Sequence, residues 1–223
     1  MAYRLVIGNK NTSSWSLRPW LAMRHARIPF SEVNIDLRAA DAKAQILAHS
    51  PAGQVPALLV DGRVVWDSLA IVEVLAETHP EAALWPKAAE ARARARSVAA
   101  EMHAGFRPLR LHCPMDFLAR NPMAPLPEEV AADVRRIVAL WRDCRGGFGA
   151  GGPFLFGDFS AADAMYAPVA SRFRTYIPDL TTYGDDGAAQ AYVDTVFAMP
   201  EMAAWEQGAR AEAAKRRLST AKS

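Results

Sequence analysis

The sequence predicts a small α/β domain followed by an all-helical domain. Strand and helix patterns alternate over residues 1–80, whereas no strand pattern follows Trp66 and the remainder is dominated by helical patterns. Pro80 and Pro86 lie where helices would have to stop. We therefore place the first domain at 1–80, a linker at 81–86 and the helical domain at 87–223.

The first domain is predicted to follow the order β-α-β-α-β-β-α. Its strand segments are apolar, β-branched or alternating, its helical segments have apolar residues near a period of 3.6, and the Asp61-Gly62 pair is typical of a hairpin bend. The expected strands are 3–8, 31–37, 55–60 and 64–66, and the expected helices are 15–27, 39–48 and 68–77.

Pro19 defines the expected start of the first helix. A proline fits the first turn because its missing N–H would have no partner there. We expect the helix to begin between Trp15 and Arg18, which leaves Ser13 and Ser14 in the preceding loop or at its end.

The helical domain begins with a long Ala- and Arg-rich pattern that we expect to kink at Pro108. Ser160 and Asp163 have the spacing of a capping box, so we expect them to start a core helix rather than to take part in chemistry. The predicted helices are 87–119, 127–145, 160–176, 186–197 and 200–216.

Composition excludes several classes of function. The 223 residues are 51% hydrophobic and 22% charged, as expected of a folded soluble protein, and 26 basic residues are interspersed with 24 acidic ones. We therefore expect no nucleic-acid or membrane partner. Cys113 and Cys144 stand alone and the histidines show no metal-ligand spacing, so we expect no metal. No signal-peptide pattern is present, so we expect a cytoplasmic protein.

A hydroxyl-rich stretch that includes Ser13, Ser14 and Ser16 is the candidate reactive site. The first N–H groups of a helix lack partners and lie at the positive end of its dipole, so an anion is stabilised there. A serine hydroxyl at this position adds a hydrogen bond to the anion.

Two further motifs carry binding groups. Pro56 is either an ordinary strand-start proline or follows a cis bond that exposes the main chain of Val55 to a bound peptide. Asp67 and Ser68 lie between a strand and a helix, where we expect one or the other to cap the helix. They are also suited to an amino-acid-like ligand, because Asp67 can pair with an ammonium group and Ser68 with a carboxylate.

Four motifs in order resemble the bacterial cytosolic glutathione transferases of the serine type, over essentially the whole chain. They are Ser13–Arg18, Gln54–Leu58, Asp67–Ile71 and Phe159-Ser160-x-x-Asp163. The resemblance implies a thioredoxin-like first domain, a helical second domain, a homodimer, glutathione as co-substrate and a cis Val55–Pro56 bond. It assigns the contact with the glutathione sulfur to Ser13, with Ser14 as its rival. The implied glutathione-binding residues are Gln54, Val55, Pro56, Asp67 and Ser68.

The electrophile is expected between the domains, against the long helix. The candidate residues, which apart from the first lie at near-helical spacing, are Trp15, Met102, Phe106, Arg107 and Arg110. Core packing is the alternative for Met102 and Phe106, and the two arginines favour an anionic or polar electrophile.

Conjugation of glutathione to a small electrophile is the function that these motifs favour. One alternative is a glutathione-dependent isomerase of the maleylacetoacetate type, because Ser13-Ser14-x-Ser16 resembles the zeta-class Ser-Ser-Cys signature. Trp15 departs from that signature by placing a large indole at the third position. The other alternative is a non-catalytic glutathione-fold ligand-binding protein.

Overall fold

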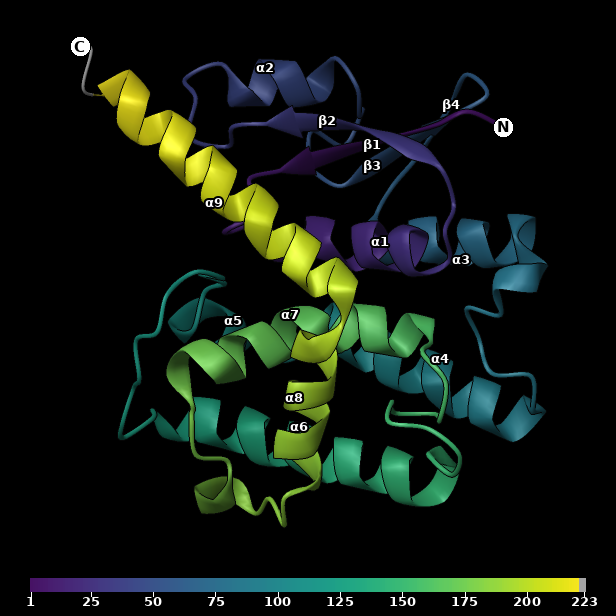
Figure 1. The fold of residues 1–223 in the computed structure, drawn as a ribbon, viewed down its shortest axis with the longest axis vertical. Coiled ribbons are helices and arrows are strands. Elements are labelled where there is room, and N and C mark those ends of the chain that lie inside the picture. Colours follow the sequence, from purple (N-terminus) through teal and green to yellow (C-terminus); the bar gives the residue numbers. More distant parts are fainter. Residues whose placement is uncertain (221–223) are drawn as a thin grey trace.

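The computed structural model describes residues 1–220 and has a sheet-containing half and a helical half (Figure 1). The first half contains strands β1 (Tyr3–Gly8), β2 (Phe30–Ile35), β3 (Ala57–Val60) and β4 (Arg63–Val65), with helices α1 (Ser14–His25), α2 (Ala42–Leu47) and α3 (Ser68–Thr78). The second half contains α4 (Ala89–Ala104), α5 (Arg107–His112), α6 (Glu128–Phe148), α7 (Ala161–Tyr176), α8 (Ala188–Ala198) and α9 (Pro200–Thr220). Short 3-10 turns lie at Pro80–Ala82 and Thr181–Tyr183. The predicted thioredoxin-like half and helical half are both confirmed.

The sheet has the strand order β2-β1-β3-β4, with β1 parallel to β2 and antiparallel to β3. Alternate residues of β1 face opposite sides, because successive side chains of a strand do so. Leu5 and Ile7 join the core formed with α1, α3 and the helical half, whereas Val6 packs against Ile46 of α2 in a separate cluster. The predicted hairpin is present, with Asp61 and Gly62 both at positive φ.

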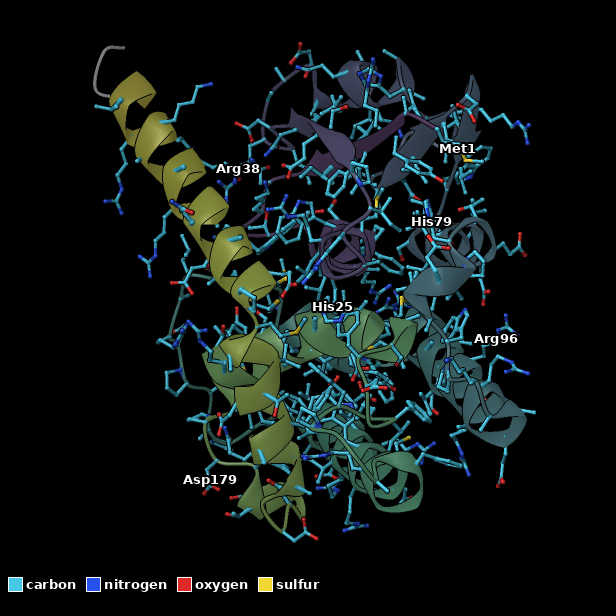
Figure 2. The ribbon with its side chains drawn as sticks, turned by 45° about the vertical axis from the view of Figure 1, so that its right-hand side comes forward. Met1, His25, Arg38, His79, Arg96 and Asp179 are labelled. Carbon is cyan, nitrogen blue, oxygen red and sulfur yellow. The ribbon has the colours of Figure 1, made fainter. Side chains whose placement is uncertain are left out.

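Helix α1 lies between the sheet and α7, and Figure 2 shows it nearly end-on. It begins at Ser14 with Ser13 as its N-cap, so the expectation that Ser14 precedes the helix is wrong. Pro19 lies in the second turn rather than the first. Only one backbone hydrogen bond is lost there, and burial of nine of the twelve helical residues offsets that loss.

The single long helix expected over 87–119 is also wrong, because the chain breaks between α4 and α5. Gly105 ends α4 in an extended conformation, and a Cβ at this position would lie 2.7 Å from the carbonyl oxygen of Glu101. Phe106 has a φ of 53°, and Pro108 lies in the first turn of α5, where a proline is tolerated. Pro108 therefore helps to start a new helix instead of kinking an old one.

The N-terminus of α7 is held by four hydrogen bonds to one carboxylate. The carboxylate of the buried Asp163 accepts from the N–H of Ser160 at 2.8 Å, the hydroxyl of Ser160 at 2.9 Å, the N–H of Leu155 at 3.1 Å and the hydroxyl of Tyr192 at 2.9 Å. Burial raises the pKa of Asp163, and these four hydrogen bonds oppose the rise. The predicted capping box is confirmed.

No helix within residues 1–220 is both long enough and apolar enough to cross a lipid bilayer.

Replacement of Asp163 by Ala is expected to lower the free energy of unfolding by about 3 kcal/mol or more, because it leaves several buried donors unpaired. Ser160→Ala, which removes a capping hydroxyl, should cost about 1 kcal/mol. Urea unfolding followed by circular dichroism measures both values. Asp158→Ala is the control, since this exposed neighbour forms none of these bonds, and equal losses in Asp158→Ala and Asp163→Ala would contradict the assignment.

Candidate active site

A cavity of about 430 Å³ lies in the sheet-containing half beside the N-terminal end of α1. Its walls are formed by Trp15, Leu37, Ile46, Gly53, Gln54, Val55, Pro56, Trp66 and Asp67. The cavity thus brings together five residues singled out from the sequence, although they come from three separate segments. We refer to it as the groove.

The Val55–Pro56 segment forms one side of the groove. The Val55–Pro56 peptide bond is cis, as the resemblance implies. Val55 lies outside the β3 ladder, and its main-chain groups form none of the turn or loop hydrogen bonds found among residues 1–220. They are therefore suited to pair with an extended ligand backbone.

Asp67 and Ser68 form the junction between β4 and α3. Asp67 is the N-cap of α3, and its Oδ1 accepts from the N–H of Leu69 at 3.0 Å. Its Oδ2 lies 3.2 Å from Nε2 of His103, a residue that sequence reasoning did not select. Ser68 is fully buried, and its hydroxyl accepts from Arg18 at 3.3 Å. The capping interpretation is confirmed, and a role in binding a ligand stays a prediction.

The two candidate serines point toward different parts of the protein. Oγ of Ser13 lies 2.7 Å from Oγ of Ser16, which itself accepts from the N–H of Gly8 at 3.1 Å. Oγ of Ser14 instead accepts from Arg172 of α7 at 3.3 Å. Ser13 is thus directed toward Ser16 and the sheet, and Ser14 toward the helical half. Both serines are buried next to Trp15, and neither lines the groove itself.

These contacts indicate which hydroxyl donates its proton to which acceptor. Because Ser16 accepts from Gly8, it can use its own proton to donate to Ser13. Ser13 then keeps its proton for an anionic acceptor outside this chain of hydroxyls. Ser16 belonged to the hydroxyl-rich stretch in the sequence, but its position between Gly8 and Ser13 depends on the fold.

Two buried arginines lie beside the serines, and sequence reasoning missed the roles of both. The guanidinium of Arg18 lies 4.2 Å from the centroid of the Trp15 ring, and its Nε has no hydrogen-bond partner among the described residues. Burial, together with the charges of Arg172 and Arg110, lowers the pKa of Arg18 to about 9. Burial likewise lowers the pKa of Arg172 to about 10. The site therefore carries positive charge that an anionic ligand would partly neutralise.

The residues predicted for the electrophile side are divided between core and surface. Met102 is fully buried, Phe106 is 7% exposed, and both belong to the hydrophobic core instead of lining the groove. Arg107 is exposed on α5, whereas the guanidinium of Arg110 lies 5.5 Å from the centroid of the Trp15 ring. Their helical spacing is interrupted by the break at Gly105.

The imidazole ring of His103, in α4, packs against the indole ring of Trp15. The two rings meet edge to face with centroids 5.2 Å apart, and Nδ1 of His103 is buried with no hydrogen-bond partner in the described part of the chain. Burial lowers the pKa of His103, while the carboxylate of Asp67 opposes this by favouring the imidazolium.

Within residues 1–220, no group of three or more His, Cys, Asp or Glu residues is arranged to hold a metal ion.

Comparison with known proteins identifies the class to which this two-part fold belongs. Residues 12–78 match the glutathione S-transferase N-terminal domain, and residues 125–209 match the glutathione S-transferase C-terminal domain. The chain belongs to the glutathione S-transferase family.

The similar proteins carry the names of two kinds of enzyme, isomerases and transferases. A probable maleylacetoacetate isomerase from Caenorhabditis elegans is 37% identical over 100 residues, which are 45% of this chain and 46% of that protein, so the match spans less than half of each. Maleylacetoacetate isomerase from Rattus norvegicus is 25% identical over 178 residues, 78% of this chain and 79% of that one. A solved glutathione transferase homolog from Burkholderia gl BGR1, with bound glutathione, superposes with a TM-score of 0.70 at 21% identity, over 94% of this chain and 98% of that one. This structural likeness shows the fold.

Replacement of Asp67 by Asn is expected to lower the pKa of His103 further below its ordinary value of about 6.5. The neutral amide removes the negative charge that favours the imidazolium, whereas the burial that disfavours it remains. An NMR titration of the imidazole protons measures the shift. Asp61→Asn, in the exposed hairpin turn, is the matched control, and an unchanged or raised pKa of His103 in Asp67→Asn would rule out the interaction.

Proposed function

We propose that the protein is a glutathione transferase in which Ser13 stabilises the glutathione thiolate and the thiolate attacks a small electrophile. The observation that carries this proposal is the groove itself. It gathers Trp15, Val55, Pro56 and Asp67 beside the N-terminus of α1, where a thiolate would meet both the helix dipole and a serine hydroxyl.

The groups around the groove match the ends of a γ-glutamyl tripeptide. The main chain of Val55, flanked by Gln54 and Pro56, would pair with the cysteinyl residue. Asp67 would bind the ammonium group of the γ-glutamyl end. The N–H of Ser68 at the start of α3 would bind its carboxylate, with the charge of Arg18 close behind.

Ser13 and the helix can supply enough energy to ionise a thiol near neutral pH. A free thiol has a pKa of about 8.5, and lowering it by about two units requires about 2.7 kcal/mol. A hydrogen bond to a charged group contributes about 1.5–3 kcal/mol, and a helix N-terminus about 0.3–1 kcal/mol. The protein then supplies an ionised nucleophile and holds it close to the electrophile.

A glutathione-dependent isomerase is the second candidate, and the relatives named maleylacetoacetate isomerase favour it. The two reactions share the thiolate and differ in what becomes of it. A transferase keeps the new carbon–sulfur bond, so each turnover consumes one glutathione, whereas an isomerase releases glutathione unchanged. Thiol consumption during turnover of maleylacetoacetate therefore separates them.

The domain limits at 80 and 87, the homodimer and the cytoplasmic location stay predictions.

Replacement of Ser13 by Ala is expected to raise the pKa of the bound glutathione thiol by about one to two units, which corresponds to the loss of one hydrogen bond to a thiolate. The thiolate absorbs in the ultraviolet, so a pH titration of the complex measures this pKa. Ser16→Ala should give a smaller rise, because it removes only the hydroxyl that donates to Ser13.

Ser14→Ala is the matched control for the neighbouring hydroxyl. A rise in Ser14→Ala alone would move the role by one residue. A bound thiol that stays protonated near neutral pH in the parent protein would instead favour the non-catalytic alternative.

Arg110→Ala is expected to raise the KM for an acidic electrophile several-fold relative to a neutral electrophile of similar shape. The guanidinium of Arg110 lies 5.5 Å from the centroid of the ring of Trp15, which lines the groove, so its charge would attract an anion bound there. Arg107→Ala should have a weaker effect in the same direction, because this side chain is more exposed. Arg120→Ala, on an exposed loop, serves as the control. Equal KM ratios in all four proteins would show that the arginines do not select the electrophile.

A further inference from the structure

We propose that the groove prefers γ-glutamylcysteinyl peptides with an uncharged, apolar C-terminal end over glutathione itself, whose C-terminal end is a carboxylate. The proposal rests on the proposed function, because it assigns a class of thiol substrate to the same site. The two ends of the groove offer a ligand different groups, and this difference carries the inference.

The two ends of the groove belong to opposite faces of the sheet. Helix α2 covers one face, whereas α1 and α3 cover the other (Figure 1). Ile46 of α2 lines the groove on the first side, and Asp67, the N-cap of α3, lines it on the second. The ends of an extended tripeptide point away from its middle residue. If the cysteine pairs with Val55 and the γ-glutamyl end reaches Asp67, the third residue therefore lies toward α2.

Leu37 is held over the end of β1 on the face that α2 covers. Gly8 and Val6 point to this same face, because they are two residues apart in the strand. A Cβ on Gly8 would lie 2.5 Å from Cδ1 of Leu37, so the glycine leaves room for the leucine. The N–H of Leu37 also donates to Oδ1 of Asn9 at 2.9 Å. These contacts place Leu37 at the α2 end of the groove.

The α2 end of the groove is apolar. Leu37 is 37% exposed and Ile46 lies beside it in the lining, while Trp66 at the other end is 47% exposed. Exposed apolar side chains that line a cavity indicate contact with an apolar part of a ligand. Within the described chain, Asp67 is the only charged residue that lines the groove, and the amide of Gln54 carries no charge.

The two cations that flank the α2 end in the sequence do not line the groove. Nζ of Lys43 donates to the carbonyl oxygen of Gly53 at 2.9 Å, and the side chain is otherwise exposed. Arg38 is exposed next to Leu37 in the chain. A carboxylate placed against Leu37 would lose water without gaining an ionic partner, which is unfavourable. An uncharged, apolar end would instead remove apolar surface of Leu37 from water, which is favourable.

Isothermal titration calorimetry with glutathione and its glycyl ethyl ester tests the proposal. The ester replaces the C-terminal carboxylate by an uncharged, more apolar group and leaves the γ-glutamyl end and the thiol unchanged. Its Kd is expected to be about two- to fivefold lower than that of glutathione, because the ethyl group contacts Leu37 and no carboxylate is desolvated. An equal or higher Kd for the ester would overturn the preference.

Leu37→Lys is expected to reverse this preference, because it supplies a cation at the α2 end. The variant should bind glutathione about threefold or more tightly than the ester. Leu111→Lys, an exposed leucine on α5 outside the groove, makes the same change in charge and should keep the parent preference. A parent-like preference in Leu37→Lys would show that the third residue lies elsewhere and would overturn the proposal.

Leu37→Ala tests the same contact without adding a charge, and it decides the matter if circular dichroism shows that Leu37→Lys does not fold. The smaller side chain should raise the Kd of the ester about threefold and change that of glutathione less than twofold. Equal changes for the two ligands would overturn the proposal.

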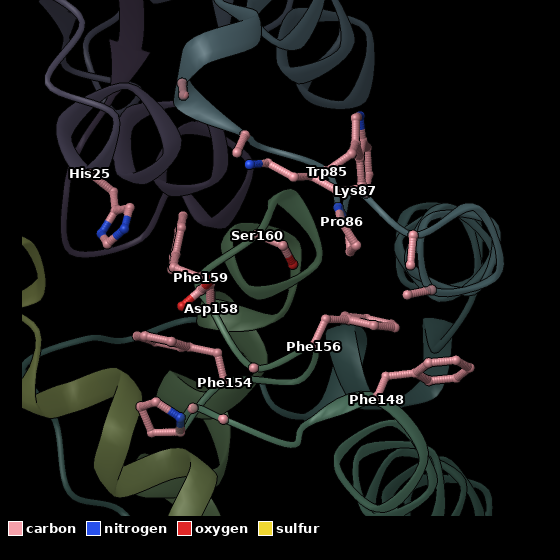
Figure 3. Close-up of a pocket in the computed structure, with 18 residues that line it drawn as sticks. His25, Trp85, Pro86, Lys87, Phe148, Phe154, Phe156, Asp158, Phe159 and Ser160 are labelled. Carbon is pink, nitrogen blue, oxygen red and sulfur yellow. The ribbon is translucent and has the colours of Figure 1, made fainter.

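Lys43 is the alternative partner for a C-terminal carboxylate. Under the proposal, Lys43→Ala changes the ratio of the two Kd values less than twofold. Lys87→Ala is the matched control, because Lys87 lies at a separate cavity between the C-terminal end of α1 and the loop that joins α6 to α7 (Figure 3). The two cavities share no lining residue. A higher Kd for glutathione alone in Lys43→Ala would overturn the proposal.

Failure of the proposed function gives a different result from failure of this inference. Tighter binding of the ester, combined with a bound thiol that stays protonated near neutral pH, would support the ligand class and overturn the transferase. Weaker binding of the ester, combined with a lowered thiol pKa, would overturn the ligand class and leave the transferase in place.

Discussion

The burial of helix α1 between the sheet and the helical half is the constraint on which the candidate active site depends. Its serine end is held by Gly8, which donates to Ser16, and by Arg172 of α7, which donates to Ser14. Further along, Trp20 packs against Trp205 of α9 with ring centroids 5.0 Å apart. A helix held on both sides cannot shift by a fraction of a turn without breaking several of these contacts. The serines and His25 therefore keep fixed positions at its two ends.

This packing also buries the positive charge of Arg18, which lowers the stability of the fold. Burying a cation without an ionic partner is unfavourable, and the lowered pKa of Arg18 reflects that cost. Two neighbouring guanidinium groups, those of Arg172 and Arg110, add to it. An anion bound in the groove would reduce the repulsion among these guanidinium groups. The energetic cost of burying Arg18 would then be lower in the complex than in the free protein, which favours binding of a carboxylate or thiolate. Under the proposed function, this charge cluster contributes to the binding of an anionic ligand and not to the stability of the fold.

Local signals predicted the fold where a short segment determines its own structure. Asp61-Gly62 bends the hairpin, and Ser160 with Asp163 starts α7, because turns and caps depend on neighbours a few residues away. The same local rules failed at Pro19, where tertiary burial outweighs one missing hydrogen bond, and at Gly105, where an extended residue followed by Phe106 at positive φ ends the helix. The contacts of Arg18 and His103 could not be predicted for a related reason, since their partners come from distant segments that only the folded chain brings together.

The sequence predicts the groove only in part, and the reason is physical. The groove offers main-chain groups exposed by a proline and by helix starts, and such features have local sequence signals. The positive charges beside it have no such signal, because the guanidinium groups of Arg18, Arg110 and Arg172 come together only in the folded chain. A local motif can therefore indicate which main-chain groups a site offers, whereas the charge of the site depends on contacts between distant segments.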